Sequence, residues 1–174
     1  TGELKTLPGT LEDPDSGYRS RIDKTTEVST PGYYAVTLTD YNIKAEITAT
    51  TRTGFHRYTF PKSTTSRILF DIGHKQGESA TITDAAVTYH PETNEVTGWV
   101  ENYPIYATFC QPNGKIKIFF ADKLDKKPQT IGTFIDEKIQ ENSNSVKGPG
   151  CGLYLTFQTK AKEQIQMQVG LSYT

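Results

Sequence analysis

The sequence predicts an all-β protein, built as a single large antiparallel twisted β-sandwich. The composition is the first indication, because ten Tyr, eight Phe and many Thr favour strands, while 14 Gly and nine Pro favour turns. The second is a period of two, in which apolar and polar residues alternate along short segments. The third is the frequency of turn signals, about every 8–12 residues, which is typical of sandwiches and barrels.

Turn residues divide the chain into strands after a loop-like start over residues 1–17. Pro31-Gly32 precedes an aromatic and β-branched run, and the two segments that follow it alternate clearly up to Pro61. The expected strands, in order, are 33–39, 43–50, 53–60, 66–72, 79–89, 95–101, 105–110, 115–121, 130–135, 152–158 and 164–173.

The connections are less regular in the second half of the chain. Asn113-Gly114 is a hairpin signal between 105–110 and 115–121, and 90–94 forms a longer turn. Residues 122–150 are polar and weakly patterned, and we expect a flexible loop over 141–150. Thr133–Gln140 is the one segment that could instead form a short helix, although it lacks good caps.

The length and charge limit the classes of function. A chain of 174 residues fits one domain, 1–174, which buries roughly 70% of its unfolded surface. The net charge of -1 and the absence of a basic stripe argue against nucleic acid, and no apolar run approaches the ~20 residues of a membrane span. Cys110 and Cys151 lack metal-site spacing, so they form either a disulfide or two buried thiols.

Several segments resemble the N-terminal β-sandwich domain of the family 92 glycoside hydrolases. They occur in the order of that family: SGYRSRIDKTTEVSTPGYYAVTL, IKAEITATTRTGFHRYTFP, ILFDIGH, VTGWV, PIYATF, GCGLYLTFQT and IQMQVGLSYT. The resemblance implies a galactose-mutarotase-like supersandwich. It also implies that these 174 residues are an incomplete piece of the N-terminal domain of a larger enzyme, without its helical catalytic domain.

The resemblance further implies the chemistry of the whole enzyme. Family members are calcium-dependent, inverting exo-α-mannosidases that remove terminal α-mannose, chiefly α-1,2-linked, from N-glycans or mannans. Their catalytic carboxylates and most Ca²⁺ contacts belong to the helical domain. We therefore carry over no catalytic residue, and we expect no cofactor bound by this chain. Its partners would be the helical domain and a mannose-containing glycan, in an exported bacterial protein of the periplasm or the extracellular space.

The first candidate residues for a domain interface or for sugar binding are Arg52, His56, Arg57 and Tyr58. Alternation places Arg57 on one face of its strand, and His56 with Tyr58 on the other. A guanidinium and an imidazole can bind sugar hydroxyls or the carboxylates of a partner domain. The alternative is a solvated strand face with a histidine in the core. The resemblance favours a structural or interface role.

Arg21, Glu27 and Trp99 complete the candidate set. After Arg21, Ile22-Asp23-Lys24 replaces the aromatic-Ser-His triplet usual in the family. We therefore interpret the region around Arg21 and Glu27 chiefly as a charged edge strand, which discourages aggregation. Trp99 is the only tryptophan, and it is either a platform that stacks on a sugar ring or a core residue.

The spacing of the acidic residues indicates neither a catalytic carboxyl pair nor an EF-hand calcium loop. Glycoside hydrolysis needs two carboxyl groups, and sequence spacing pairs no two of the 20 acidic residues across a sugar. Asp13-x-Asp15-x-Gly17 begins like a calcium loop, but an EF-hand needs an acid where Lys24 stands. Three hypotheses remain open: an accessory domain of an α-mannosidase, an autonomous carbohydrate-binding module, and a protein-interaction sandwich.

Overall fold

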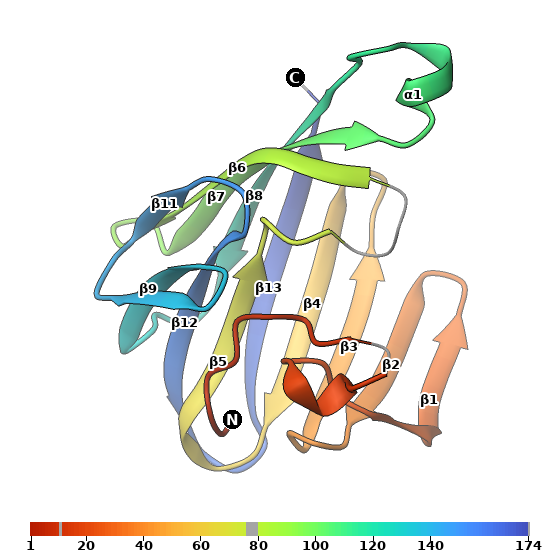
Figure 1. Cartoon of the computed structure of the whole chain (residues 1–174). Helices are drawn as coiled ribbons and strands as arrows, with labels where there is room; N and C mark the ends of the chain where they lie inside the picture. Colours follow the sequence, from red (N-terminus) through yellow and green to blue (C-terminus); the bar gives the residue numbers. More distant parts are fainter. Residues whose placement is uncertain (11, 76–79, 174) are drawn as a thin grey trace.

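The fold consists of two antiparallel β-sheets, which confirms the all-β prediction (Figure 1). The computed structural model describes residues 1–10, 12–75 and 80–173. Within these ranges, no helix has the length and apolar character needed to cross a bilayer.

The large sheet has nine strands in the order β1-β2-β3-β4-β13-β8-β7-β6-β11. Its strands are β1 (Ile22–Thr30), β2 (Tyr33–Leu38), β3 (Ile43–Ala49), β4 (Thr53–Phe60), β6 (Ala80–His90), β7 (Glu95–Pro104), β8 (Ile116–Leu124), β11 (Ser145–Lys147) and β13 (Glu163–Ser172). The small sheet has the order β10-β9-β12-β5. Its strands are β5 (Ser63–Asp71), β9 (Thr130–Ile135), β10 (Lys138–Glu141) and β12 (Cys151–Thr159). Two short helices complete the described elements, η1 (Pro14–Ser16) and α1 (Ala107–Cys110).

The core lies between the small sheet and the middle of the large sheet. Leu153, Leu155 and Phe157 alternate along β12 and are fully buried, as is Ile165 on β13. Burying each such side chain contributes about 1.5–3 kcal/mol. We call the face of the large sheet that contributes to this core its inner face, and the opposite face its outer face.

The small sheet covers only part of the large one, because β1–β3 extend beyond its edge strand β5 (Figure 1). The described part of the N-terminal segment, residues 1–10 and 12–18, lies against this region. The Tyr18 hydroxyl donates to Asp71 at the end of β5, and the Tyr41 hydroxyl donates to the Tyr18 carbonyl oxygen. The segment thereby links β5 to the turn between β2 and β3.

Most predicted strands are confirmed, with ends that shift by a few residues. The charged edge strand around Arg21 and Glu27 is β1. The prediction over 79–89 corresponds to β6, although its first residue, Ser79, lies outside the described residues.

The strand predicted over 105–110 is wrong, because α1 occupies most of that range. β7 and β8 pair directly, and their last pair at this end joins Asn102 to Ile116, so the hairpin ladder stops before 105–110. The Asn113-Gly114 signal does form a turn, with a φ of 68° at Asn113 and a bond from the Gly114 N–H to the Gln111 carbonyl. That turn ends the helical connection rather than joining two strands.

Residues 122–150 are more regular than predicted. The short helix considered for Thr133–Gln140 is instead the hairpin β9–β10, which turns at Asp136 with a φ of 51°. The loop over 141–150 contains β11, which pairs with β6 at the edge of the large sheet. The two cysteines are free thiols, with Cys110 exposed and Cys151 buried, so neither alternative for this pair holds in full.

Candidate functional site

β4 and the turn before it carry four of the candidate residues, and the structure divides them among three places. Arg52 is exposed in the turn between β3 and β4. Arg57 is exposed on the outer face, whereas His56 and Tyr58 lie on the inner face with the core residue Phe60. The predicted alternation is confirmed, but the four residues do not form one cluster.

On the outer face, Arg57 is held by a carboxylate of its own sheet. Its Nε and Nη2 donate to the Glu46 oxygens over 2.9 and 2.8 Å, a bidentate pair. The Tyr33 hydroxyl donates to Glu46 over 2.7 Å, and the Lys44 Nζ lies 3.2 Å from the same oxygen. The Glu46 side chain is only 7% exposed. Arg57 therefore helps to neutralise a buried carboxylate within this sheet.

The network fixes the ionisation of Glu46. Hydrogen bonds from Arg57, aided by those from Tyr33 and Lys44, outweigh burial and lower the pKa of Glu46 from 4.5 to about 2. Glu46 and Arg57 are cross-strand partners in the β3–β4 register, so one hairpin creates the pair.

Glu46→Gln is expected to reduce the decrease in the free energy of unfolding that accompanies a fall in pH from about 4.5 towards 2. The folded-state pKa is depressed, so the stability from Glu46 is complete above about pH 4.5 and is lost as the pH falls towards 2. Gln keeps the shape but does not ionise. Urea unfolding between pH 2 and pH 6 measures the effect, with the exposed Glu137→Gln as the control. Equal acid slopes for Glu46→Gln and the parent chain would contradict this assignment.

On the inner face, His56 and Tyr58 form a polar pair at the margin of the core. The His56 Nδ1 lies 2.9 Å from the Tyr58 hydroxyl oxygen, and the two rings are tilted by 42°. Burial lowers the pKa of His56, which favours the neutral imidazole. Burial also raises the pKa of Tyr58, so its hydroxyl stays protonated. His56 and Tyr58 therefore form a hydrogen-bonded unit within the domain.

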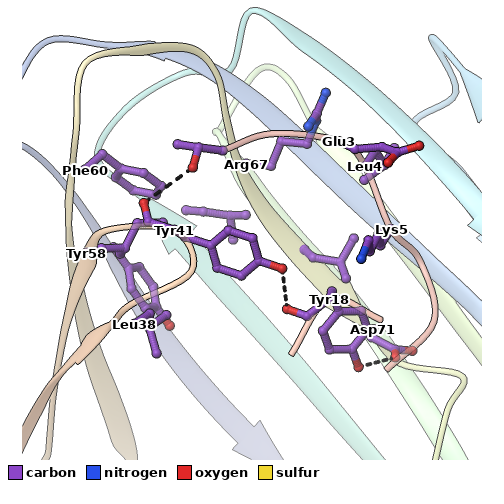
Figure 2. A pocket seen from close by; sticks show the side chains of 14 residues that line it. Glu3, Leu4, Lys5, Tyr18, Leu38, Tyr41, Tyr58, Phe60, Arg67 and Asp71 are labelled. Carbon is purple, nitrogen blue, oxygen red and sulfur yellow. Dashed lines mark hydrogen bonds between the residues drawn. The ribbon is translucent and has the colours of Figure 1, made fainter. Parts of the chain in front are cut away.

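Tyr58 also lines a cleft of about 400 Å³ between β5, the ends of β2–β4 and the N-terminal segment (Figure 2). Its walls combine aromatic rings, aliphatic side chains and charged groups. The lining residues are Thr1, Glu3, Leu4, Lys5, Tyr18, Leu38, Tyr41, Ile43, Tyr58, Phe60, Arg67, Ile68, Leu69 and Asp71. A volume of this size is within the range of small-molecule sites.

The polar groups of the cleft are largely engaged within the protein. Asp71 accepts from the Tyr18 hydroxyl over 2.6 Å, and its other oxygen lies 2.8 Å from the His74 Nδ1. The Arg67 Nη1 donates to the Gly2 carbonyl over 2.5 Å, while its buried Nε has no hydrogen-bond partner among the described residues. Tyr18 and Tyr41 belong to connecting segments, and no sequence pattern brought them together with Tyr58.

Arg21 and Glu27 lie apart from this cleft's aromatic wall and serve local contacts. The Arg21 guanidinium lies 3.0 Å from carboxylate oxygens of both Asp15 and Asp40, all near the start of β1. Glu27 accepts from the Tyr34 hydroxyl on the neighbouring strand over 2.8 Å. Exposed contacts of this kind contribute little stability, so they chiefly order the edge strand.

Trp99 lies half-buried on the outer face of the large sheet, not in the core between the two sheets. The Lys117 Nζ lies 3.6 Å from the centroid of its ring, and the Lys147 Nζ lies 5.6 Å away. These are cation–π contacts. Because ammonium groups already contact the ring, it is not an open platform for a sugar.

Within residues 1–10, 12–75 and 80–173, no three His, Cys, Asp or Glu side chains gather as a metal site would require.

The comparisons place this geometry among known proteins. The model of the glycosyl hydrolase family 92 N-terminal domain matches residues 1–172. Two structures of a family 92 α-mannosidase from Bacteroides thetaiotaomicron, one in complex with mannoimidazole, align with 99% of this chain at 29% identity, with TM-scores of 0.87 and 0.86. A family 92 inverting mannosidase from the same organism, at 19% identity and a TM-score of 0.72 over 88% of the chain, shares the fold.

Comparison with curated proteins gives no match. The chain spans 22% and 23% of the length of the two α-mannosidase structures. The match of the family model covers almost all of the chain and agrees with the two-sheet fold. The chain therefore belongs to glycoside hydrolase family 92, as its N-terminal domain.

Proposed function

We propose that this chain is the accessory, non-catalytic domain of an exo-acting α-mannosidase. The observation that carries the proposal is the alignment of 99% of the chain with 22% of a family 92 α-mannosidase. In such an enzyme the sandwich would pack on a helical catalytic domain of the same polypeptide and shape one side of the active site. The substrate would be a terminal α-mannose, chiefly α-1,2-linked, of an N-glycan or mannan.

The carboxylates of the described residues support a non-catalytic role. An inverting glycosidase needs an acid and a base about 6.5–9.5 Å apart, facing the same sugar. Glu46 is tied to Arg57 on the outer face, and both oxygens of Asp71 are engaged in the cleft. The contribution of this domain would be positioning, which matters because small displacements of a substrate cost much in rate.

Two further expectations belong to the whole enzyme. We propose that its Ca²⁺ is held by residues outside this chain, which is consistent with the donor sets of the described residues. We also propose that the enzyme is an exported bacterial protein of the periplasm or the extracellular space; the bacterial source of the matched structures supports only the bacterial origin.

The test compares the chain of residues 1–174 with the longer protein that contains it. We expect the longer protein to release mannose from α-1,2-linked mannobiose, and the isolated chain to give no turnover above a buffer blank, with or without CaCl₂. Turnover by the isolated chain would overturn the accessory role. Lack of hydrolysis of every α-mannoside by the longer protein would overturn the enzyme class.

A carbohydrate-binding module is the second candidate, and the cleft is the observation that favours it. Its three tyrosine rings could stack on the apolar face of a pyranose while Arg67 donates to a hydroxyl group. Titration of the isolated chain with methyl α-mannoside distinguishes the two functions. Saturable binding that is lost in Tyr41→Ala would favour the module, whereas the accessory role predicts no heat of binding.

A further inference from the structure

Exposed apolar side chains gather at one end of the large sheet. Of the ten large hydrophobic residues that are exposed in the described part of the chain, five lie there: Ile105, Tyr106, Phe109, Leu171 and Tyr173. Phe109 is 84% exposed, and each of the other four is more than half exposed. We call this region, residues 105–113 with 171–173, the α1 end.

Strand register places these residues together. The β7–β8 ladder ends at the pair Asn102 and Ile116, so the connection that carries α1 continues outward from there. The β13–β8 ladder ends at the pair Ser172 and Phe119, so Tyr173 runs on in the same direction. Figure 1 shows α1 and the C-terminus at the same end of the molecule.

The connection presents its apolar side chains in an ordered way. Ala107 is buried and anchors α1, while the N–H groups of Phe109 and Cys110 donate to the Tyr106 carbonyl over 3.0 Å. The Gln111 N–H donates to the Ala107 carbonyl, also over 3.0 Å. The backbone is therefore fixed by its own bonds, and Tyr106 and Phe109 remain exposed to solvent.

This end also lacks charge. Residues 102–114 contain no Asp, Glu, Lys or Arg, and neither do residues 164–174, although 22% of the chain is charged. Protein interfaces are depleted in charged residues at their centres and enriched in aromatic ones. An exposed, uncharged aromatic surface on a folded domain marks an interaction site rather than an ordinary surface.

We propose that the α1 end is the docking surface for the polypeptide that follows this domain in the longer enzyme, with Phe109 and Tyr106 as its anchors. The inference rests on the proposed function, because it requires that longer polypeptide. The matched α-mannosidases are more than four times as long as the aligned segment, and the matching family domain is N-terminal. The end of β13 lies at this surface, beside α1 (Figure 1).

The occupant must offer apolar pockets for two aromatic rings. A partner of opposite charge is not favoured, because the surface offers no charge to pair with. Truncating a central aromatic anchor of an interface typically weakens it by tenfold or more. Phe109→Ala, alone and with Tyr106→Ala, is therefore the informative change. Ile139→Ala is the matched control, since Ile139 is exposed on β10 of the small sheet.

Hydrogen exchange of the longer protein and of the isolated chain is the direct measurement. We expect the amides of 105–113 to exchange at least about tenfold more slowly in the longer protein. Phe109→Ala should remove this protection and make the region between the two parts more sensitive to protease, while Ile139→Ala should change neither. The isolated Phe109→Ala chain should unfold like its parent, which separates docking from folding.

The outcomes distinguish this inference from the proposed function. Equal exchange of 105–113 in both proteins, in a longer protein that still hydrolyses α-mannosides, would overturn the docking surface alone. Protection without any hydrolysis would overturn the enzyme class and support the surface. Dimerisation of the isolated chain that Phe109→Ala abolishes, without protection in the longer protein, would assign the surface to a second copy and overturn the inference.

Discussion

Asp122→Asn is expected to remove a loss of stability that the domain undergoes between about pH 4 and pH 7. Asp122 lies on β8, is 4% exposed, and has an Oδ1 without a hydrogen-bond partner among the described residues. Its cross-strand neighbours are Val96 and Val169. Burial raises the pKa of its carboxyl from 3.8 to about 7, because an apolar surrounding disfavours the charged form.

The direction of the effect follows from proton binding. Below about pH 4 the carboxyl is protonated in both the folded and the unfolded chain, and above about pH 7 it is ionised in both. Between these limits the folded chain holds more protons, so the free energy of unfolding falls as the pH rises. The full difference is on the order of 4 kcal/mol, since the pKa rises from 3.8 to about 7 and one pKa unit corresponds to about 1.4 kcal/mol.

Other groups titrate in neighbouring windows, so the comparison must be made between variants. The ionisation of Glu46 changes the free energy of unfolding below about pH 4.5. Burial lowers the pKa of His56, so its neutral form adds stability as the pH rises towards the ordinary histidine value of 6.5. Urea unfolding should be measured at pH 4.5, 6 and 8. The free energy of unfolding of Asp122→Asn, relative to that of the parent chain, should increase at each step. The exposed Glu92→Gln is the control. If the free energy of unfolding varied with pH in the same way for Asp122→Asn and the parent chain, the assignment of Asp122 as a buried carboxyl without a compensating partner would be refuted.

Local alternation explains why much of this fold could be predicted. It assigned His56 and Tyr58 to one face and Arg57 to the other, because side chains along a strand alternate strictly. The pairing of Glu46 with Arg57 could also be predicted from the sequence. A hairpin that pairs Ala49 with Gly54 places these two residues opposite each other. The contact follows only when the alternation in the two strands is combined with the turn that pairs them.

Other features depend on tertiary structure. Residues 105–110 have the aromatic and β-branched composition of a strand, but β8 pairs with β7 only as far as Asn102, and α1 forms where a longer hairpin would need another strand pair. The cleft is assembled from Tyr18, Tyr41 and β5, which are far apart in sequence. The sequence does indicate that Asp122 is unusual. It stands between Phe120 and Leu124 in the alternation, where the pattern predicts an apolar residue. Its altered pKa, however, follows from the burial created by the assembled sheet.

Phe157→Ala is expected to be among the most destabilising single changes in this domain. Phe157 lies on β12 and is fully buried in the core between the two sheets. Removing its ring forfeits its burial and leaves a cavity, which typically costs about 3–5 kcal/mol. A domain of this size has about 5–15 kcal/mol of total stability, so much of the margin would be lost. Urea unfolding of the isolated chain measures the change.

Phe109→Ala is the matched comparison, because the same residue type is lost from an exposed position. Its effect on the isolated chain should stay within about 0.5 kcal/mol, as for most surface substitutions. A large effect of Phe109→Ala would show that the α1 end is part of the folding core, and a small effect of Phe157→Ala would show that the sheets are loosely packed. The expected contrast separates the aromatic residue that holds the sandwich together from the one that is available to the proposed docking partner.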